Sequence, residues 1–351
     1  MAADAEKFAL EGSAEAKQIA RLERKLEAKT GEVTRLKRRA TAAEEERSEA
    51  EKLYAGVLEL AERPVEPLRV HVRPAKDRSR VCPVILASDW HVDEVVDPRT
   101  VRNMNEYSPE IASARAERFF QKIVRLVNLR RKQDEISELV LWLGGDFVTA
   151  YLHDEARETN SMGPFEAKAF AMDLLIGGLD YLLARSDCER ILLPCNVGNH
   201  GRITKEIRTS TIATTNHEWE LYNLLARHFK KEKRLEWQIS RGPDLVFDVY
   251  GFKIRGTHGQ EIRYMGGVGG IAVPLNRAIG STMRADPVNF DILAHHHSLN
   301  YSPLWMINGS LIGYAGYPLY KRLPYDPPQQ GMFFVDQERK KISSMAPIWV
   351  E

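Results

Sequence analysis

Residue types that bind divalent metal ions recur at the ends of several short apolar segments of this chain. Asp89 and His91 end the segment VCPVILASDWH, Asp146 ends ELVLWLGGD, and Asn199 and His200 end ILLPCNVGNH. Short apolar runs of this kind are typical of buried strands, and open α/β sheets bind their ligands just beyond the carboxyl ends of strands. The pattern therefore predicts that these side chains meet at one edge of a sheet.

Two later segments add histidines after further apolar runs. KIRGTHG brings in His258, and DILAHHHS brings in His295, His296 and His297. Each cluster alone is weak evidence, because Gly-Asp pairs commonly mark turns and a lone histidine is more often an ordinary core or surface residue. Five clusters together indicate two divalent ions held by imidazole and oxygen ligands, which suit Mn, Fe or Zn better than Mg. Ions about 3.5–4 Å apart clamp the attacking and leaving oxygens of a phosphoester.

The elements that must position these residues alternate between strand and helix. This alternation predicts a layered α/β domain over residues 81–351. Helices are predicted at 109–133, 165–185 and 216–230, and strands at 81–89, 138–146, 189–198, 244–257, 289–294, 303–308 and 331–336.

The segment 1–62 is rich in Ala, Glu, Lys and Arg and contains no proline. Its apolar residues repeat at heptad spacing, which predicts a coiled coil that joins copies of the chain into a homo-oligomer. A single solvated helix, or one packed on the main domain, is the alternative. Lys29 and Arg47 interrupt the apolar seam, and Gly31 weakens it. The two core positions of the heptad hold Ile19, Leu26, Val33, Ala40 and Tyr54, and Leu22, Leu36, Ala43, Ala50 and Val57.

Composition limits the class of protein. The formal charge of the 351 residues is +1, so the chain lacks the overall basic character of many nucleic-acid-binding proteins, although a local patch would suffice. Three cysteines without a C-x-x-C pair suit a reducing compartment, and neither a signal peptide nor a membrane span is recognised. We expect a cytoplasmic protein with no membrane partner, in which a basic, proline-containing linker at 63–80 separates the two parts.

In chain order, the clusters form the motif set D-x-H, G-D, G-N-H, H and G-H-x-H. They stand here as Asp89-Trp90-His91, Gly145-Asp146, Gly198-Asn199-His200, His258 and Ala294-His295-His296-His297. Over about residues 81–336 the chain therefore resembles the calcineurin-like metallophosphoesterase superfamily. The resemblance implies a four-layer α/β/β/α sandwich, here with the N-terminal coiled-coil helix attached.

The resemblance also implies two metal ions, with Asp146 bridging them. The ligands of the first ion would be Asp89, His91, Asp146 and His297, and those of the second Asp146, Asn199, His258 and His295. A hydroxide between the ions would attack phosphorus. His200 would protonate the leaving group or stabilise the charge of the transition state.

Two residues depart from the family pattern. Gly201 stands where relatives carry an acid after G-N-H, so Asp154 or Glu155 would have to orient His200, or His200 acts as a neutral hydrogen-bond donor. Ala294 replaces a glycine, which is a milder change. His296 lies between two predicted ligands, and its side chain should point away from them, so we interpret it as structural.

The motifs leave the substrate open. The segments LGGDFVTAYLHDEARETNSMGPFEA and NGSLIGYAGYPLY resemble phage and prophage members of the superfamily, some relatives of which are nucleases that process DNA ends. Arg202 and Lys205 are predicted to contact the substrate phosphate. We expect a Mn-dependent nuclease or phosphodiesterase acting on DNA; a phosphomonoesterase and an inactive coiled-coil scaffold are the alternatives. Four tyrosines either stack on unpaired bases or pack beneath a loop: Tyr314, Tyr317, Tyr320 and Tyr325.

Overall fold

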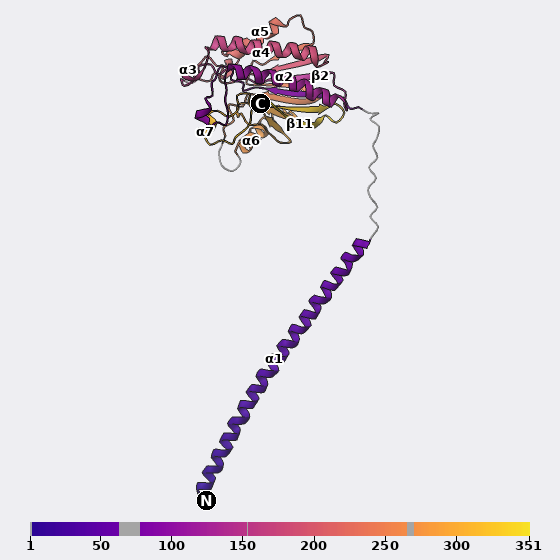
Figure 1. The fold of residues 1–351 in the computed structure, drawn as a ribbon, viewed down its shortest axis with the longest axis vertical. Helices are drawn as coiled ribbons and strands as arrows, with labels where there is room; N and C mark the ends of the chain where they lie inside the picture. The colour runs from indigo at the N-terminus through magenta and orange to yellow at the C-terminus, as the bar shows by residue number, and fades with distance from the viewer. Residues whose placement is uncertain (1, 63–77, 153, 265–269) are drawn as a thin grey trace. The chain divides into compact units, whose positions relative to one another are not determined.

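The computed structural model describes residues 2–62, 78–152, 154–264 and 270–351, and the chain divides into two units, Met1–Arg73 and Pro74–Glu351 (Figure 1). The described residues of the first unit form one helix, α1 (Ala2–Glu62), as predicted. The large apolar side chains at its heptad positions are exposed, from 49% at Val33 to 69% at Leu26. Pairing of α1 in a coiled coil stays a prediction, and most of the predicted linker at 63–80 lies outside the described residues.

The described residues of the second unit form two β-sheets, which with the helices confirm the mixed α/β fold. The first sheet consists of β11 (Lys341–Trp349), β10 (Gln329–Asp336), β1 (Val81–Ala87), β2 (Glu138–Leu143), β3 (Arg190–Cys195) and β4 (Leu235–Ile239). Strands β1 to β4 are parallel, β10 pairs antiparallel with β1, and β11 pairs antiparallel with β10.

The second sheet consists of β5 (Asp244–Val249), β6 (Phe252–Thr257), β7 (Phe290–Leu293), β9 (Trp305–Ile307) and β8 (Asn300–Tyr301). Strands β6, β7 and β9 are parallel, and β5 and β8 pair antiparallel at the two edges.

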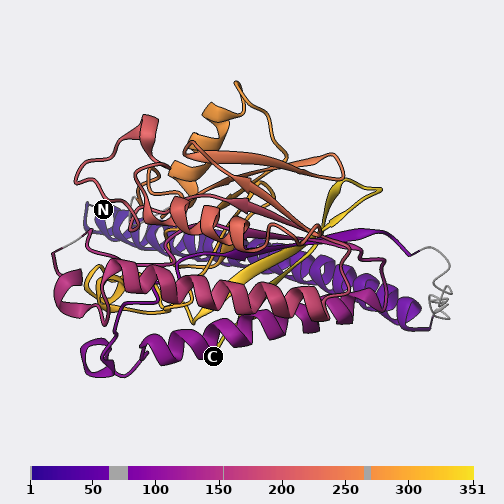
Figure 2. The same cartoon turned by 90° about the horizontal axis from the view of Figure 1, so that it is seen from above.

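The described helices of this unit are α2 (Pro109–Arg131), α3 (Ala156–Thr159), α4 (Pro164–Arg185), α5 (His217–His228), α6 (Ala272–Thr282) and α7 (Gly316–Tyr320), with 3₁₀ turns at Pro98–Val101 and Thr209–Thr211. Figure 2 shows α2 (purple) and α4 (magenta) side by side.

Apolar side chains alternate along the strands and fill separate core regions. On β1, Ile85 packs in a cluster with helices α2, α4 and α5, whereas Leu86 packs in a cluster with the second sheet. Leu293 and Trp305, on the other face of the second sheet, pack against α6.

Several elements differ from the sequence-based predictions. The strand predicted at 244–257 is a hairpin of β5 and β6, which turns at Tyr250 and Gly251, both with positive φ. Helix α6 and the strands β4, β8 and β11 were not predicted. Helix α6 buries only Leu275 and Ile279, so its apolar stripe is short. Strand β11 lies at a sheet edge and contains Pro347, a residue that edge strands tolerate.

The ends of the strands explain how the site is assembled. Ala87 of β1 pairs with Leu143 of β2, which pairs with Cys195 of β3, so these three parallel strands end at one level. In the second sheet, Thr257 of β6 likewise pairs with Leu293 of β7. Each of the predicted metal-binding clusters follows one of these strand ends. Within the described part of the chain, no helix combines the length and the apolar character needed to cross a membrane.

Candidate metal centre

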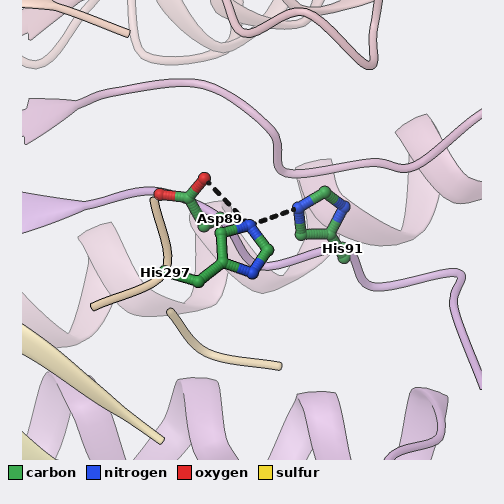
Figure 3. Close-up of side chains that lie close together, drawn as sticks. All are labelled: Asp89, His91 and His297. Carbon is green, nitrogen blue, oxygen red and sulfur yellow. Dashed lines mark hydrogen bonds and ion pairs between the residues drawn. The ribbon is translucent and has the colours of Figure 1, made fainter. Parts of the chain in front are cut away.

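The first group of predicted ligands joins the loops after β1 and β7. Asp89, His91 and His297 each place a ligand atom within 4.8 Å of the others (Figure 3). Nε2 of His297 lies 3.2 Å from Nε2 of His91 and 3.4 Å from Oδ1 of Asp89. Asp89 is held in place by the Ser88 hydroxyl, which donates to its Oδ2 at 2.6 Å, and by the backbone N–H of His295.

The second group joins the loops after β2, β6 and β7. Asp146, His258 and His295 again place their ligand atoms within 4.8 Å, and Nε2 of His258 lies 2.9 Å from Oδ2 of Asp146. Asn199 belongs here as well, since its Oδ1 is 3.1 Å from the same nitrogen. His91, Asp146 and His200 also place ligand atoms within 4.8 Å of one another. His91 of the first group and Asp146 of the second are therefore close together. The structure thus brings all the predicted ligands together; His296 is in neither group.

The donor atoms are arranged as they would be around cations. The Nε2 atoms of His91 and His297 face each other at 3.2 Å, so one ion between the imidazoles could be bound by both. Oδ2 of Asp146 is buried and accepts no well-aligned hydrogen bond from the described residues, despite the nearby His258. Burial lowers the pKa of His91 and of His295 well below the usual range, so both imidazoles are neutral and keep a lone pair. Convergent neutral imidazoles and carboxylates fit divalent ions.

The charge of Asp146 dominates the second group. Burial by itself lowers the pKa of His258, but the Asp146 carboxylate outweighs this effect and raises the pKa to about 10. Burial likewise raises the pKa of Asp146, yet His258 and His200 hold it well below its ordinary value. A proton on His258 therefore supplies positive charge that a bound metal ion would otherwise bring.

Groups behind the ligands fix which imidazole nitrogen faces the site. Nδ1 of His91 lies 2.9 Å from the Thr149 hydroxyl, which donates to Oε2 of Glu94 at 3.2 Å. Nδ1 of His258 is 2.8 Å from the carbonyl of Gly144. Partners of this kind orient metal-ligating histidines and hold Nε2 toward the metal. Sequence reasoning missed Thr149 and Glu94; their only signal is that each follows a metal motif by three positions.

The backbone at the ligands adopts a conformation that L-residues rarely take. Asp89, His91, Asp146, His295 and His297 all have φ between 50° and 70°. Such left-handed positions cost about 1–3 kcal/mol each and are concentrated at functional sites. The strain is consistent with loops shaped to converge their ligand atoms.

Two loops also approach each other too closely for side chains. A Cβ added to Gly198 would lie 2.0 Å from Oδ1 of Asp146, and one added to Gly145 would lie 2.1 Å from the backbone nitrogen of Gly198. The glycines in the second and third motifs therefore allow the Asp146 and Asn199 loops to touch.

His200 lies against the first group. Its backbone N–H donates to Oδ1 of Asp146 at 2.9 Å, and its ring stands edge to face on His91 with centroids 4.8 Å apart. Nδ1 of His200 is 3.3 Å from the carbonyl of Thr149. This carbonyl serves as an orienting acceptor, whereas Asp154 and Glu155, which the sequence proposed for that purpose, are exposed.

The predicted phosphate contacts lie on the loop that follows the third motif. The Arg202 guanidinium donates to the carbonyls of Thr204 at 2.8 Å and Lys205 at 3.1 Å, so it organises its own loop. The side chain of Lys205 is exposed. Contact of either residue with a phosphate stays a prediction.

The four tyrosines do not share one environment. Tyr314 is buried, and its hydroxyl donates to the carbonyl of Leu323, so it packs beneath its loop. Tyr325 is half-exposed beside the Tyr314 ring. Tyr317 and Tyr320, on α7, are 68% and 80% exposed and remain available for stacking.

Comparison with known proteins gives a fold-level likeness only. No family model and no curated protein matches the chain. Among solved structures, it is similar to Vps29 from Entamoeba histolytica complexed with zinc, at 13% identity over 76% of this chain and 99% of that one, with a TM-score of 0.29. A predicted phosphoesterase from Streptococcus pneumoniae shows 11% identity over 76% and 97%, with a TM-score of 0.28. A phosphatase from Mycoplasma pneumoniae shows 12% identity over 77% and 92%, with a TM-score of 0.29. Similarities this weak assign no activity to the chain.

Proposed function

We propose that this protein is a metal-dependent phosphoesterase of the calcineurin-like type, and that its substrate is a phosphodiester bond of DNA hydrolysed with Mn. The observation that carries the proposal is the convergence of the predicted ligands into two adjoining groups around Asp146. The succession of helix, sheet, sheet and helix in the core clusters supports the four-layer arrangement that the resemblance implies.

The residues of the chain have separable tasks in this reaction. Two divalent ions bound here would lower the pKa of a water molecule and neutralise charge on the phosphoester. Asp146 would hold both ions, because it lies at the junction of the two groups. Thr149 and the Gly144 carbonyl keep Nε2 of His91 and of His258 directed at the site. His200, oriented at Nδ1 by the Thr149 carbonyl, would hydrogen-bond the leaving oxygen.

Exposed aromatic and basic side chains support a nucleic-acid substrate. The Lys321 ammonium lies 5.7 Å from the ring centre of Tyr317 and 5.4 Å from that of Tyr320. Aromatic platforms beside positive charge bind unpaired bases and the phosphate backbone together. Lys205 adds a charge on the loop after the third motif.

Cleavage of end-labelled single- and double-stranded DNA with Mn tests the proposal. The wild type should cut, Asp146→Ala should not, and the exposed Asp154→Ala serves as the matched control that retains activity. Intact DNA with hydrolysis of p-nitrophenyl phosphate would replace the nuclease with a phosphomonoesterase. If a Mn-loaded sample neither cleaves DNA nor hydrolyses p-nitrophenyl phosphate, the result would favour a scaffold that binds metals without turnover.

A further inference from the structure

The buried carboxylate of Glu218 contacts both the loop that carries Asp146 and the loop that carries Asn199. Oε1 of Glu218 accepts the backbone N–H of Phe147 at 2.6 Å, and Oε2 accepts that of Gly198 at 2.7 Å. Phe147 directly follows Asp146, and Gly198 directly precedes Asn199. The Glu218 side chain is fully buried. A buried carboxylate is costly unless its oxygens are hydrogen-bonded, and charge-assisted bonds of this length are strong.

The same part of α5 occupies the space beside Gly201. A Cβ at position 201 would lie 2.4 Å from Oδ1 of Asn216 and 3.0 Å from Cγ of Glu218. Asn216 holds the start of α5 in this position, because its Nδ2 donates to the Gly198 carbonyl at 2.8 Å and its Oδ1 accepts the N–H of Glu218 at 2.9 Å. The backbone N–H of His217 also donates to the Gly201 carbonyl. A side chain at position 201 would therefore displace the Asn216 amide and press on the Glu218 side chain.

We infer that Glu218 is a positioning residue of the metal centre, which clamps the Asp146 loop to the Asn199 loop. The inference rests on the proposed function, since it concerns the ligands that hold the ions. Each Oε atom accepts the backbone N–H of a residue that neighbours a ligand in the sequence, so loss of either bond lets one ligand move relative to the other. Groups behind metal ligands typically contribute about 10–100-fold to metal affinity.

The first turn of α5 supplies a matched pair of substitutions. Glu218→Gln keeps the size of the side chain but directs an amide N–H at one of the two backbone donors. Glu220→Gln makes the same chemical change in the same turn, but Glu220 is 57% exposed and pairs with Lys168. The comparison therefore separates the contacts of Glu218 from a general effect of an acid in the first turn of α5.

The test is calorimetric titration of the metal-free full-length chain with Mn alone, beside far-UV circular dichroism and thermal melting. We expect Glu218→Gln to weaken Mn binding about 10–100-fold, and Glu220→Gln less than about twofold. Gly201→Ala should weaken it in the same direction, because the new Cβ displaces Asn216 and with it Glu218. If Glu218→Gln does not fold, Mn titration of Gly201→Ala and of Glu218→Asp, which retains the carboxylate, tests the positioning role instead. Wild-type Mn affinity in both variants would overturn that role.

The outcomes distinguish the positioning role of Glu218 from the proposed phosphoesterase activity. A folded Glu218→Gln with wild-type Mn affinity, even with a lower melting temperature, would make Glu218 a purely structural residue and leave the phosphoesterase proposal standing. Failure of the wild type to bind Mn would overturn both. Weaker Mn binding in Glu218→Gln and Gly201→Ala, but not in Glu220→Gln, would establish the positioning role.

Discussion

The two units of the chain use leucine in opposite ways. In the second unit, leucines such as Leu141 and Leu182 are fully buried between helices and sheet. In α1, Leu22 and Leu26 are 59% and 69% exposed although they stand at regular heptad positions. The second unit therefore has a core of its own, whereas α1 has an ordered apolar stripe and nothing within its described residues to cover it.

By this contrast, the metal centre belongs to the second unit, whereas self-association is expected of α1. A helix with a narrow apolar stripe gains little stability alone, and heptad repeats are covered by pairing with another helix. The metal centre, in contrast, lies wholly on loops of the second unit. We therefore expect changes in one unit to leave the function of the other intact, and the following predictions test that independence.

The largest effect is expected at the shared ligand. Asp146→Ala should remove Mn binding and lower phosphoester hydrolysis by about a thousandfold or more, since metal assistance supplies several kcal/mol to the transition state. His200→Ala should lower hydrolysis but retain Mn, because its ring is assigned to the leaving group. Sedimentation of both variants should match the wild type. Equal loss of Mn in the two variants would contradict the assigned roles.

The residues of the metal centre were predictable because ligand types fall directly after apolar strands. Parallel strands that end at one level bring such residues together, as the pairing of Ala87, Leu143 and Cys195 shows. Glu218 was not predictable in this way, because its bonds depend on where α5 packs. Its one sequence signal is Asn216 two residues earlier, a helix-capping residue, and that signal marks the start of a helix without identifying what the helix contacts.

A second prediction compares two helical leucines. Leu182→Ala, on α4, should lower the unfolding free energy of the second unit by about 3 kcal/mol, whereas Leu26→Ala, on α1, should leave it unchanged. All six tryptophans lie between residues 90 and 349, so denaturation followed by tryptophan fluorescence reports the second unit alone. A shift of that transition in Leu26→Ala would show that α1 is covered by the second unit after all.

The fold was predictable where the apolar pattern along the sequence was clear. The heptads of α1 and the short, continuous apolar runs of β1 to β3 are patterns of this kind. Helix α6, with two buried residues, and β4, whose Trp237 and Ile239 are only partly buried, give no comparable pattern. Such elements are defined by tertiary packing, which a single sequence does not display.

A third prediction concerns the two charges in the apolar seam of α1. In a parallel dimer, Lys29 and Arg47 would each face their own counterpart, so replacing either with leucine should lower the dissociation constant about tenfold or more. Lys52→Leu, which lies off the seam, is the matched control and should have little effect. Sedimentation equilibrium of the full-length chain measures the change. A monomer in every variant would exclude self-association through α1, and removal of residues 1–62 should then leave the mass distribution unaltered as well.

The smallest effect distinguishes the orientation of the paired helices. A parallel, in-register dimer would set Glu32 beside Lys37 of the second copy and Arg39 beside Glu44, since these residues flank the seam at complementary heptad positions. Lys37→Gln should then weaken dimerisation by about 0.5 kcal/mol per lost pair. In an antiparallel pair whose two copies cross near residue 37, Lys37 would instead face its own counterpart, and Lys37→Gln should strengthen dimerisation by relieving repulsion. The sign of the change in dissociation constant, measured at low salt where these pairs are least screened, therefore decides between the two arrangements.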